Sequence, residues 1–319
     1  MKAEKEALTD IQHGKEGITI VVPVYNRAEV VGKTLESILR QTWRPLSVVL
    51  VDNNSTDTTA EVLRAWVPEA EKAGIDVKVL SEEREGASAA RNRGLREVTT
   101  EYVMFFDSDD IMAPEHVERA MKGFLTHPDA EIVGWTTERI FLDGHRRRLV
   151  FSDRNVKWRC LFNGMMATQR YAARTELVRR VGGWNESSLV WDDIELGTRL
   201  LAQNPKVVAL KGPVTVEVVA QECSITGLRF SESPERREHT IELIEENMPG
   251  RRYRHWVSLR RMLLAGCYAR EGAMEDARRF CAYALAKERC PFYRLLMRMA
   301  YHYTAAGGRG AALILRPLY

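Results

Sequence analysis

The sequence predicts an α/β protein, with a Rossmann-like, mostly parallel central sheet flanked by helices and a helical C-terminal region. Short apolar runs rich in β-branched residues alternate with helical patterns between residues 18 and 106, which is typical of βαβ crossovers. Two of these runs end in an aspartate, at Asp52 and at Asp107. From about Pro234 onward the pattern is helical to the end of the sequence.

Four buried strands and three helices are expected in the first part of the chain. The strands cover 18–25, 46–51, 77–80 and 102–106, and the helices cover 28–41, the stretch from the turn at 53–57 through Trp66, and 87–98. The first strand is a nearly continuous β-branched apolar run, as expected of a strand that is covered on both faces. Ligands of such sheets bind beyond the carboxyl ends of the strands. The polar residues that follow the strands are therefore the candidate site.

After Pro114 the alternation loosens and the expected elements become shorter. Strands are expected over 132–135, 139–142, 207–210 and 214–219, the last two as an antiparallel pair, and helices over 170–181 and 193–202. Gly250, Gly272 and Pro291 divide the C-terminal part into four helical segments.

Composition excludes several classes of protein. Of the 319 residues, 45% are hydrophobic and 29% are charged, which is unlike a disordered, collagen-like or membrane-spanning chain. The net charge is +3, too small by itself to indicate a nucleic-acid partner. It is unevenly spread, with 33 basic and 40 acidic residues over 1–250 but 14 and 4 over 251–319. We therefore expect the two parts to face different partners.

The cysteines and the N-terminus indicate the compartment. The five cysteines are scattered and form no CxxC pair or zinc-finger spacing, so we expect reduced, mostly buried thiols in a cytoplasmic protein. Residues 1–17 are polar and mixed in charge, unlike a signal or transit peptide.

The clearest chemical signal is the tripeptide Asp107-Ser108-Asp109. Alternate residues of an extended segment point the same way, so the two carboxylates can converge at the end of the fourth strand. Two hard oxygen ligands suit Mg²⁺ or Mn²⁺, above all an ion shared with a diphosphate. The alternative is that residues 108–110 cap the helix expected after Pro114. The position at a strand end favours the metal site.

Other candidate contacts follow the neighbouring strands. Asp52 can accept a hydrogen bond from a base or a ribose hydroxyl, or it caps the next helix. Tyr25 offers a ring that can stack on a nucleobase, or it packs in the core. Arg84 and Arg91 flank the third strand–helix junction, where they can neutralise phosphate or lie solvated at the surface.

A second acidic pair, Asp192-Asp193, precedes the helix expected at 194–202. Neighbouring carboxylates disfavour joint ionisation, and one of them can serve as a general base. The alternative is helix capping, because acidic residues are favourable in a first helical turn. Without further context, capping is the better interpretation.

Five motifs, taken in order, resemble the inverting, nucleotide-sugar-dependent glycosyltransferases of family 2, which have the GT-A fold. They are VVPVYN at 21–26, VDNNSTD at 51–57, ARNRG at 90–94 after Gly86, FDSDD at 106–110, and GGWNE at 182–186 followed by WDDIEL at 191–196. The resemblance covers residues 18–227. Each motif alone is weak, but their order and spacing are specific.

The resemblance implies a role for each matching position. Donor-binding residues would be Pro23, Tyr25, Asn26, Asp52, Asn54, Arg84, Arg91, Asp107 and Ser108. Asp107 and Asp109 would form the D-x-D pair that binds ribose and Mn²⁺ or Mg²⁺, with Asp109 as the direct ligand. Asp193 would be the general base, beside Asp192.

The sequence departs from the family pattern at three places. It has Asp52-Asn53-Asn54-Ser55 where Asp-Asp-Gly-Ser is frequent, and Asp192 where the acidic pair commonly begins with Glu. It also has Gln221 where many relatives place a histidine that contacts metal or phosphate.

The resemblance implies a metal-dependent transfer of a sugar, hexosyl or N-acetylhexosaminyl, from a nucleotide sugar to an acceptor hydroxyl with inversion. A UDP-sugar and a place in polysaccharide biosynthesis are expected. One alternative is a sugar-phosphate nucleotidyltransferase, although VYNR at 24–27 is not the glycine-rich loop of that class. The other is a noncatalytic nucleotide-sugar-binding protein, against which the intact Asp107, Asp109 and Asp193 argue.

Three regions follow from these patterns: an N-terminal extension at 1–17, a GT-A domain at 18–230 and a basic C-terminal helical region at 231–319. The expected partners are the donor and a glycan or lipid-linked acceptor, without nucleic acid. Basic and aromatic residues on the C-terminal helices suit an anionic membrane surface, which would place the protein at the inner face of the membrane. The alternatives are a solvated basic face and a homo-oligomer contact.

Overall fold

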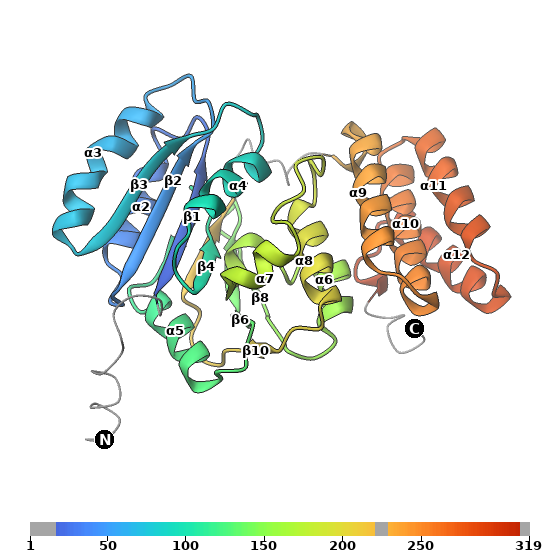
Figure 1. Ribbon diagram of the computed structural model, residues 1–319. Coiled ribbons are helices and arrows are strands. Elements are labelled where there is room, and N and C mark those ends of the chain that lie inside the picture. The colour runs from blue at the N-terminus through green and yellow to red at the C-terminus, as the bar shows by residue number, and fades with distance from the viewer. Residues whose placement is uncertain (1–16, 221–228, 313–319) are drawn as a thin grey trace. The chain divides into compact units, whose positions relative to one another are not determined.

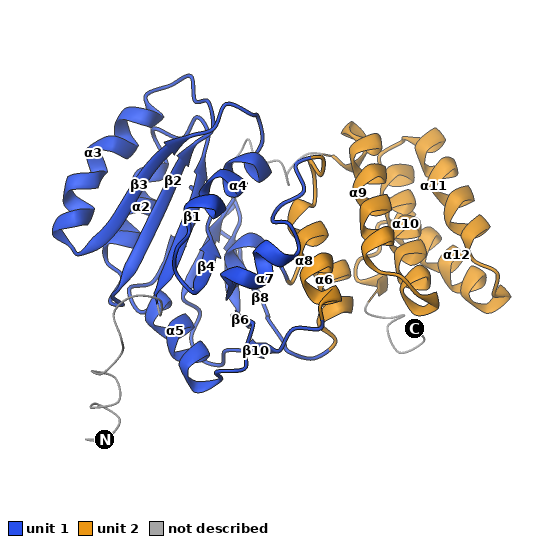
Figure 2. Cartoon of the chain, viewed as in Figure 1, with its two compact units in different colours: residues 1–154, 166–186, 204–221 blue, residues 155–165, 187–203, 222–319 orange. Residues whose placement is uncertain are grey.

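The computed structural model describes residues 17–220 and 229–312. The chain forms two compact units, one made of 1–154, 166–186 and 204–221 and the other of 155–165, 187–203 and 222–319 (Figure 2). The first unit contains both sheets, and the second is helical. Two segments of the expected domain 18–230 therefore group with the C-terminal helices, and the boundary at residue 230 stays a prediction.

The first unit is built on a seven-stranded sheet (Figure 1). From edge to edge its strands are β10 (Val207–Ala209), β6 (Ile132–Gly134), β9 (Tyr171–Arg174), β4 (Tyr102–Phe105), β1 (Ile18–Val24), β2 (Leu46–Asp52) and β3 (Ile75–Ser81). Strands β4, β1, β2 and β3 run parallel, as do β10 and β6, whereas β9 is antiparallel to both of its neighbours. The prediction of a mostly parallel sheet is confirmed.

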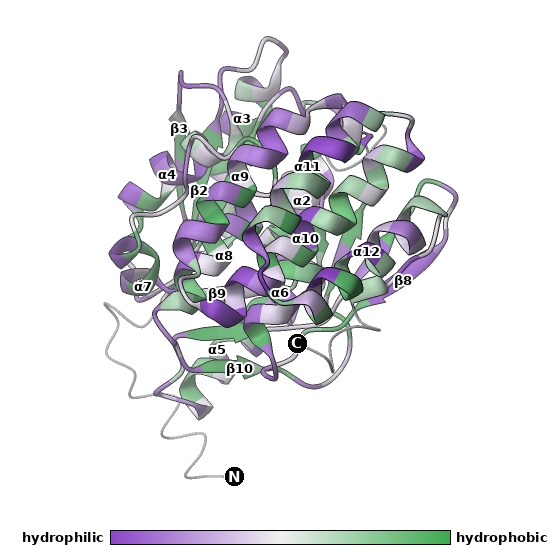
Figure 3. Ribbon diagram, turned by 90° about the vertical axis from the view of Figure 1, so that its right-hand side faces the viewer, coloured by the Kyte–Doolittle hydropathy of each residue, from purple (hydrophilic) through white to green (hydrophobic). Residues whose placement is uncertain are grey.

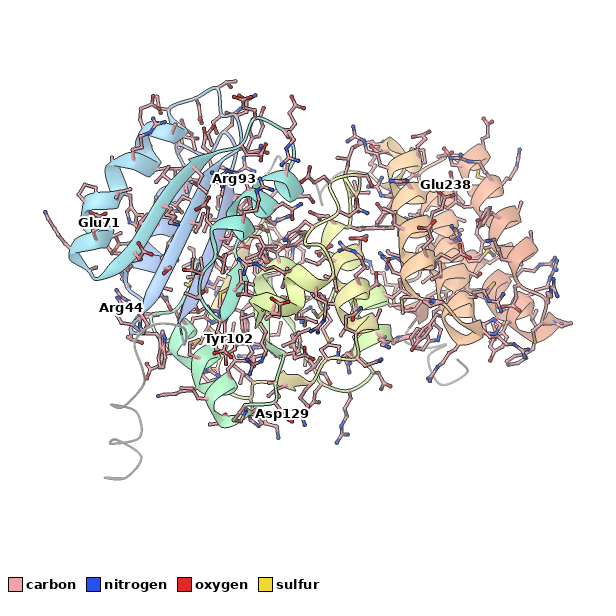
Figure 4. The ribbon with its side chains drawn as sticks, viewed as in Figure 1. Arg44, Glu71, Arg93, Tyr102, Asp129 and Glu238 are labelled. Carbon is pink, nitrogen blue, oxygen red and sulfur yellow. The ribbon has the colours of Figure 1, made fainter. Side chains whose placement is uncertain are left out.

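Helices cover both faces of this sheet because its strands are apolar on both. One core joins alternate residues of β1, such as Ile20 and Val22, with α2 (Val31–Leu39), α3 (Thr59–Lys72) and α5 (His116–Thr126). In that core Tyr102 of β4, which Figure 4 labels, stacks on Phe124 of α5, and the ring centroids lie 4.0 Å apart.

Helix α4 (Ala87–Glu97) covers the opposite face. Val21 points to that face, because successive strand residues alternate between faces. A Cβ atom at Gly94 would lie 2.4 Å from Val21 Cγ1, closer than any real contact. The glycine that ends the ARNRG motif is therefore what lets α4 approach the central strands.

Residues 170–181 do not form the single predicted helix. They form the strand β9 and the short helix α7 (Thr175–Arg180). Ala172 and Ala173 are fully buried in β9, between the edges of β4 and β6. Alanine and arginine favour helix locally, but this position between two strand edges decides the conformation.

A second, four-stranded sheet has the order β5 (Ile111–Met112), β11 (Val216–Val219), β7 (Thr137–Ile140) and β8 (Arg146–Leu149). The predicted antiparallel pairing of 207–210 with 214–219 is wrong, since β10 and β11 lie in different sheets. The bend at 212–213 separates them. Before it, Leu210 N–H donates to Gly134 O, and after it Thr215 O accepts a bond from Ala113 N–H.

The second unit consists of the helices α6 (Val156–Asn163), α8 (Asp192–Ala202), α9 (Pro234–Asn247), α10 (Arg251–Arg270), α11 (Met274–Lys287) and α12 (Pro291–Ala305). The four predicted C-terminal segments and their breaks are confirmed. Polar and apolar residues occur along each of these helices (Figure 3). They pack closely: Gly266 of α10 lies against Thr304 of α12, and Glu238 of α9 pairs with Arg279 of α11 at 2.8 Å (Figure 4).

The thiols are less buried than the sequence suggested. Among the described cysteines Cys160 is buried, but Cys267, Cys281 and Cys290 are partly exposed. Cys267 and Cys281 lie on α10 and α11, and Cys290 directly precedes α12. Cys223 lies outside the described residues. Within the described part of the chain, every helix falls short of the length or apolar character needed to span a bilayer.

Candidate functional site

The loops that carry the predicted site follow adjacent parallel strands. The register aligns Val24 of β1 with Asp52 of β2, and Asp52 with Ser81 of β3. On the other side of β1, Val21 is aligned with Phe105 of β4. Because these strands run in the same direction, the residues that follow them meet at the carboxyl edge of the sheet.

Asp52 lies at this edge with an unused acceptor. Its side chain is buried, and Asp52 Oδ1 has no hydrogen-bond partner among the described residues. The capping alternative fails, because helix α3 begins only at Thr59, whose N–H is bound by Asp57 Oδ1 at 3.0 Å. A buried carboxylate oxygen without a donor is costly, and a ligand N–H or O–H would satisfy it.

Asn53 holds the edge together, a role that sequence reasoning missed. Its Nδ2 donates to the carbonyl oxygens of Glu82 (3.0 Å) and Arg84 (2.7 Å), and its Oδ1 accepts a bond from Gly86 N–H (2.9 Å). The sequence did contain a signal for this role, because Asn53 stands where the family frequently has an aspartate. An amide can both donate and accept hydrogen bonds, whereas a carboxylate only accepts them. Asn54, at the usual glycine position, has φ 60°, which asparagine tolerates.

The loop after β1 is tied to the loop after β2. Asn26 Oδ1 accepts a hydrogen bond from Thr56 N–H (2.8 Å), and Asn26 N–H donates to Ser55 Oγ (3.0 Å). Pro23 is aligned with Val51 inside the sheet. Tyr25 follows with 56% of its surface exposed, so its ring is available to a ligand and does not pack in the core.

The two predicted arginines have different surroundings. Arg91 is buried, donates to Asp107 Oδ1 at 2.8 Å and lies over the ring of Trp184 at 4.3 Å. Arg84 is half exposed and binds Glu82 and Glu186. Its hydrogen bonds lower the pKa of Glu82 to about 2. The structure thus joins Arg91, but not Arg84, to the acidic tripeptide by a hydrogen bond.

Asp107 and Asp109 differ in how their charge is compensated. Asp107 is bound by Arg91 and, through its other oxygen, by Gln169 Nε2, a partner that sequence reasoning missed. Among the residues that the structure describes, Arg27 is the one cationic side chain within salt-bridge distance of Asp109, at 4.0 Å. Burial and the neighbouring Asp107 charge raise the pKa of Asp109 to about 6. Ser108, between them, is buried.

Asp110 serves the fold. It is buried, its Oδ1 accepts a hydrogen bond from Val219 N–H at 2.9 Å, and its carbonyl accepts one from Thr34 Oγ1 at 2.8 Å. The acid therefore links β11 of the small sheet to α2. Burial raises its pKa well above the ordinary carboxyl value.

A divalent cation fits this acidic cluster as a partial site. Over residues 17–220 and 229–312, no three His, Cys, Asp or Glu side chains converge to hold a metal by themselves. The neighbouring carboxylates of this cluster nevertheless repel one another, and a hard cation would reduce that repulsion. Its remaining ligands would then come from water or from a bound diphosphate.

The second acidic pair lies in the helical unit, at the start of α8. Asp192 Oδ1 accepts a bond from Asp193 N–H (3.0 Å), and Asp193 Oδ1 accepts one from Ile194 N–H (2.8 Å). The N-cap residue Trp191 makes no side-chain capping bond, but the two aspartates of the first turn each bind a backbone N–H of that turn with one carboxylate oxygen. Trp191, just before the pair, has φ 56°, a left-handed conformation that is unusual for a bulky residue.

Arg260 of α10 fixes this start of α8, and nothing in the sequence pattern pointed to it. Its guanidinium lies over the Trp191 ring at 4.2 Å and donates to Leu161 O of α6. Burial lowers the pKa of Arg260 to about 10, although the negative charges of Cys160 and Asp193 act to raise it. The C-terminal helices thus place a cation next to the acidic pair. Gln221 lies outside the described residues.

Comparison with known proteins places these features in a family. Residues 19–176 match the family described as glycosyl transferase family 2. Over 119 residues the chain is 37% identical to glycosyltransferase GlyA and 34% identical to glycosyltransferase GlyG, both of Streptococcus pneumoniae. Each match covers 37% of this chain, but only 16% and 38% of the two relatives. The chain thus matches well under half of their length.

Solved structures share the fold over nearly the whole chain. S. aureus TarS 1-349 in complex with UDP-GlcNAc has a TM-score of 0.64 at 16% identity, covering 92% of either chain. Mannosyltransferase PcManGT from Pyrobaculum calidifontis, in complex with GDP-Man and Mn²⁺, has a TM-score of 0.58 at 18% identity, covering 98% of this chain and 92% of that one.

The family match spans β1 to β4 and both acidic strand ends, and the fold is the GT-A fold of TarS. The chain therefore belongs to glycosyl transferase family 2.

Proposed function

We propose that the chain is an inverting glycosyltransferase that moves a sugar from a UDP-sugar to an acceptor hydroxyl. The observation that carries this proposal is the pair Asp107 and Asp109 at the carboxyl edge of a family 2 sheet, with the orphaned Asp52 Oδ1 two strands away. This edge offers a carboxylate for a base or ribose, an exposed ring, and a cation site for a diphosphate.

The donor is held by the first unit. Asp52 accepts a hydrogen bond from the nucleoside, whose base lies against Tyr25. Pro23, Asn26 and Asn54 shape this part of the pocket. Asp107 and Ser108 lie toward the ribose and diphosphate, with Arg91 holding Asp107 in place and Arg84 lying near the phosphates.

Mn²⁺ or Mg²⁺ is the expected cofactor. Asp109 is its direct ligand and Asp107 the second carboxylate, an assignment that the raised pKa of Asp109 supports. When bound, the cation neutralises the diphosphate and stabilises the departing nucleoside diphosphate. PcManGT was solved with Mn²⁺, which supports this assignment by likeness of fold alone.

Asp193 takes the proton from the acceptor hydroxyl. The hydroxyl oxygen forms its bond to the anomeric carbon while the bond from that carbon to the diphosphate oxygen breaks, so one displacement inverts the configuration. No covalent intermediate forms. Asp192 shapes the start of α8, and the charge of Arg260 favours the ionised form of Asp193.

The transferred group is proposed to be a hexosyl or N-acetylhexosaminyl residue, used in polysaccharide biosynthesis. TarS was solved with UDP and with UDP-GlcNAc, which favours uridine as the nucleoside. A nucleotidyltransferase is less favoured, because the loop after β1 is bound to the next loop by Asn26 and is not glycine-rich.

A donor panel tests the proposal without a known acceptor. Thermal unfolding would be measured with UDP-, GDP- and TDP-sugars, each with Mn²⁺ and with a chelator, and the slow hydrolysis of the best donor would follow. We expect a UDP-sugar to raise the melting temperature only with metal, and the released sugar to have inverted anomeric configuration by NMR. Retained configuration, or binding without any turnover, would contradict the proposal.

We also propose that the second unit contacts an anionic lipid surface at the inner face of the membrane, where a lipid-linked acceptor would reside. Phe292, Leu295, Met299 and Tyr303 lie on one face of α12 and are 44–58% exposed. Residues 289–312 contain four arginines and no acidic residue. An apolar stripe with basic neighbours is typical of interfacial helices.

Sedimentation with vesicles tests this contact. The wild type should bind phosphatidylglycerol vesicles at low salt and leave them as salt rises, and phosphatidylcholine vesicles should retain little. Replacing Leu295 and Met299 by serine should abolish binding. A concentration-dependent dimer that the same pair of substitutions dissolves would instead assign this face to a homo-oligomer.

A further inference from the structure

A cavity of about 460 Å³ lies in the helical unit, at the start of α10 and beside the connection from α11 to α12. Its charged and polar lining consists of Arg251, Arg254, His255, Lys287, Glu288 and Arg289. None of these residues belongs to the family motifs or to the catalytic roles proposed above.

The cavity has an excess of positive charge. Among the described residues, Arg251, Arg254 and Arg289 are exposed and form no ion pair. Lys287 differs, because it pairs with Glu245 at 3.4 Å. Three guanidinium groups therefore line one hollow, and none of the three is in an ion pair with a described residue.

Glu288 is the acidic residue of the lining, and its carboxylate is bonded to residues other than the three arginines. It is buried, one oxygen contacts His255 Nδ1, and the other accepts a hydrogen bond from Cys290 N–H at 2.8 Å. The ring of His255 also stacks on Tyr293, with centroids 4.3 Å apart. These contacts hold Glu288 and His255, two residues of the lining, in place beside the arginines.

The three arginines come from two segments and can surround one anion. Arg251 and Arg254 are three residues apart on α10 and share a helix face, and Arg289 comes from the connection to α12. Guanidinium groups bind phosphate oxygens through paired N–H donors. The volume of the cavity lies within the range of small-ligand pockets, which leaves room for an organic group attached to the phosphate.

We propose that this cavity binds a phosphate ester through Arg251, Arg254 and Arg289. The site lies within the second unit and does not depend on the proposed sugar transfer. The same chemistry occurs in a soluble sugar or glycerol phosphate and in the head group of an anionic phospholipid. The experiment separates these two sources.

Calorimetry with sn-glycerol 3-phosphate tests the site, in the presence of a chelator so that a metal-dependent donor site stays silent. The cavity variant replaces Arg254 and Arg289 by glutamine. The control replaces Arg270 and Arg278 by glutamine; both are exposed, on α10 and α11, and neither lines the cavity. Both variants lose two positive charges. We expect the cavity variant to bind at least ~10-fold more weakly and the control to bind like the wild type.

Alkylation of Cys290 gives an independent readout, since this partly exposed thiol also lines the cavity. Peptide mass spectrometry would follow its modification, with Cys267 and Cys281 as internal controls. Protection of Cys290 by glycerol phosphate identifies a soluble ester as the ligand. Protection only by phosphatidylglycerol vesicles, and not by phosphatidylcholine vesicles, identifies a lipid head group.

Two results would overturn the proposal. One is the absence of Cys290 protection by either probe in the wild type. The other is equal protection in the wild type and in the variant with Arg254 and Arg289 replaced, because general electrostatic attraction to a basic unit would then suffice.

Discussion

Two acidic residues, one in each unit, differ in how their charge is compensated. In the sheet unit, Arg27 is the one cationic side chain among the described residues that lies within salt-bridge distance of Asp109, at 4.0 Å, and the pKa of Asp109 is raised to about 6. In the helical unit, Asp193 lies in the first turn of α8, and its charge acts on the buried guanidinium of Arg260. The charge of Asp109 is therefore weakly compensated, whereas the fold supplies Asp193 with a buried cation.

This difference separates two kinds of function. A weakly compensated carboxylate such as Asp109 can attract a divalent cation that arrives with the substrate. Its contribution to binding then depends on the metal concentration in solution. A carboxylate that lies next to a cation of the chain itself is favoured in its ionised form, and it can accept a proton without any added ion. Metal removal should therefore affect the sheet unit, and replacement of Arg260 should affect the helical unit.

The largest expected effect belongs to Asp193. Asp193→Asn keeps the side-chain volume but removes the basic charge, so the turnover rate should fall by ~10²–10⁴. Asp192→Asn should cost less, because the proposed role of Asp192 is to shape the helix start. Sugar transfer measured on both variants checks this. A dead Asp192→Asn with a normal Asp193→Asn would make Asp192 the base, and two active variants would place the base elsewhere.

The next effect concerns metal-dependent binding. Asp109→Ala should remove the Mn²⁺-dependent part of UDP affinity, a loss of ~100-fold or more, because the direct ligand is gone. Asp110→Asn is the matched control, since the Asp110 side chain accepts a bond from Val219 N–H inside the fold and its replacement should affect stability only. Titration calorimetry with and without Mn²⁺ compares them. Unchanged Mn²⁺-dependent affinity in Asp109→Ala would remove it from the metal site.

Replacement of Arg260 should produce a smaller, specific effect. In Arg260→Met the loss of the nearby cation disfavours the ionised form of Asp193, so the acidic limb of the pH–rate profile should move to higher pH. Turnover at pH 7 should fall by ~10-fold. Arg260→Lys should restore the profile in part, and Arg270→Met on the same helix should not change it. A lower rate with an unmoved profile would mean a purely structural role.

The smallest effect tests whether the two units unfold independently. His116 of α5 is buried with Thr215 bonded to its Nδ1, and burial lowers its pKa to about 3. The unfolded chain takes up the proton at its ordinary pKa of about 6.5, whereas the folded chain does not. The sheet unit should therefore lose stability as the pH falls below 6.5, by ~1 kcal/mol per pH unit.

Hydrogen exchange at pH 7 and pH 5.5 can resolve this loss. Protection of α5 should fall in the wild type, less so in His116→Gln, and α10 of the helical unit should respond little. An equal response of α5 and α10 would show that the two units unfold as one.

The sequence predicted best those features that are encoded locally. Strands β1, β2 and β4 were found because each is a largely apolar run, and β3 because of its apolar residues Val77, Val79 and Leu80. Asp52, Asp107 and Asp109 were found because they follow such runs. Strand β9 was missed because Tyr171–Arg174 becomes a strand only between the edges of β4 and β6. Gln169 and Arg260 were missed for a related reason: their partners lie far away in the chain, and neither residue type marks a site by itself.

The central claim is that donor binding belongs to the sheet unit and proton transfer to the helical unit. Titration of UDP into Asp193→Asn in the presence of Mn²⁺, beside the wild type and Asp109→Ala, tests it most directly. We expect Asp193→Asn to bind UDP within about twofold of the wild type while Asp109→Ala loses Mn²⁺-dependent binding. If Asp193→Asn lost UDP affinity as strongly as Asp109→Ala, the two acids would serve one function and the claim would be wrong.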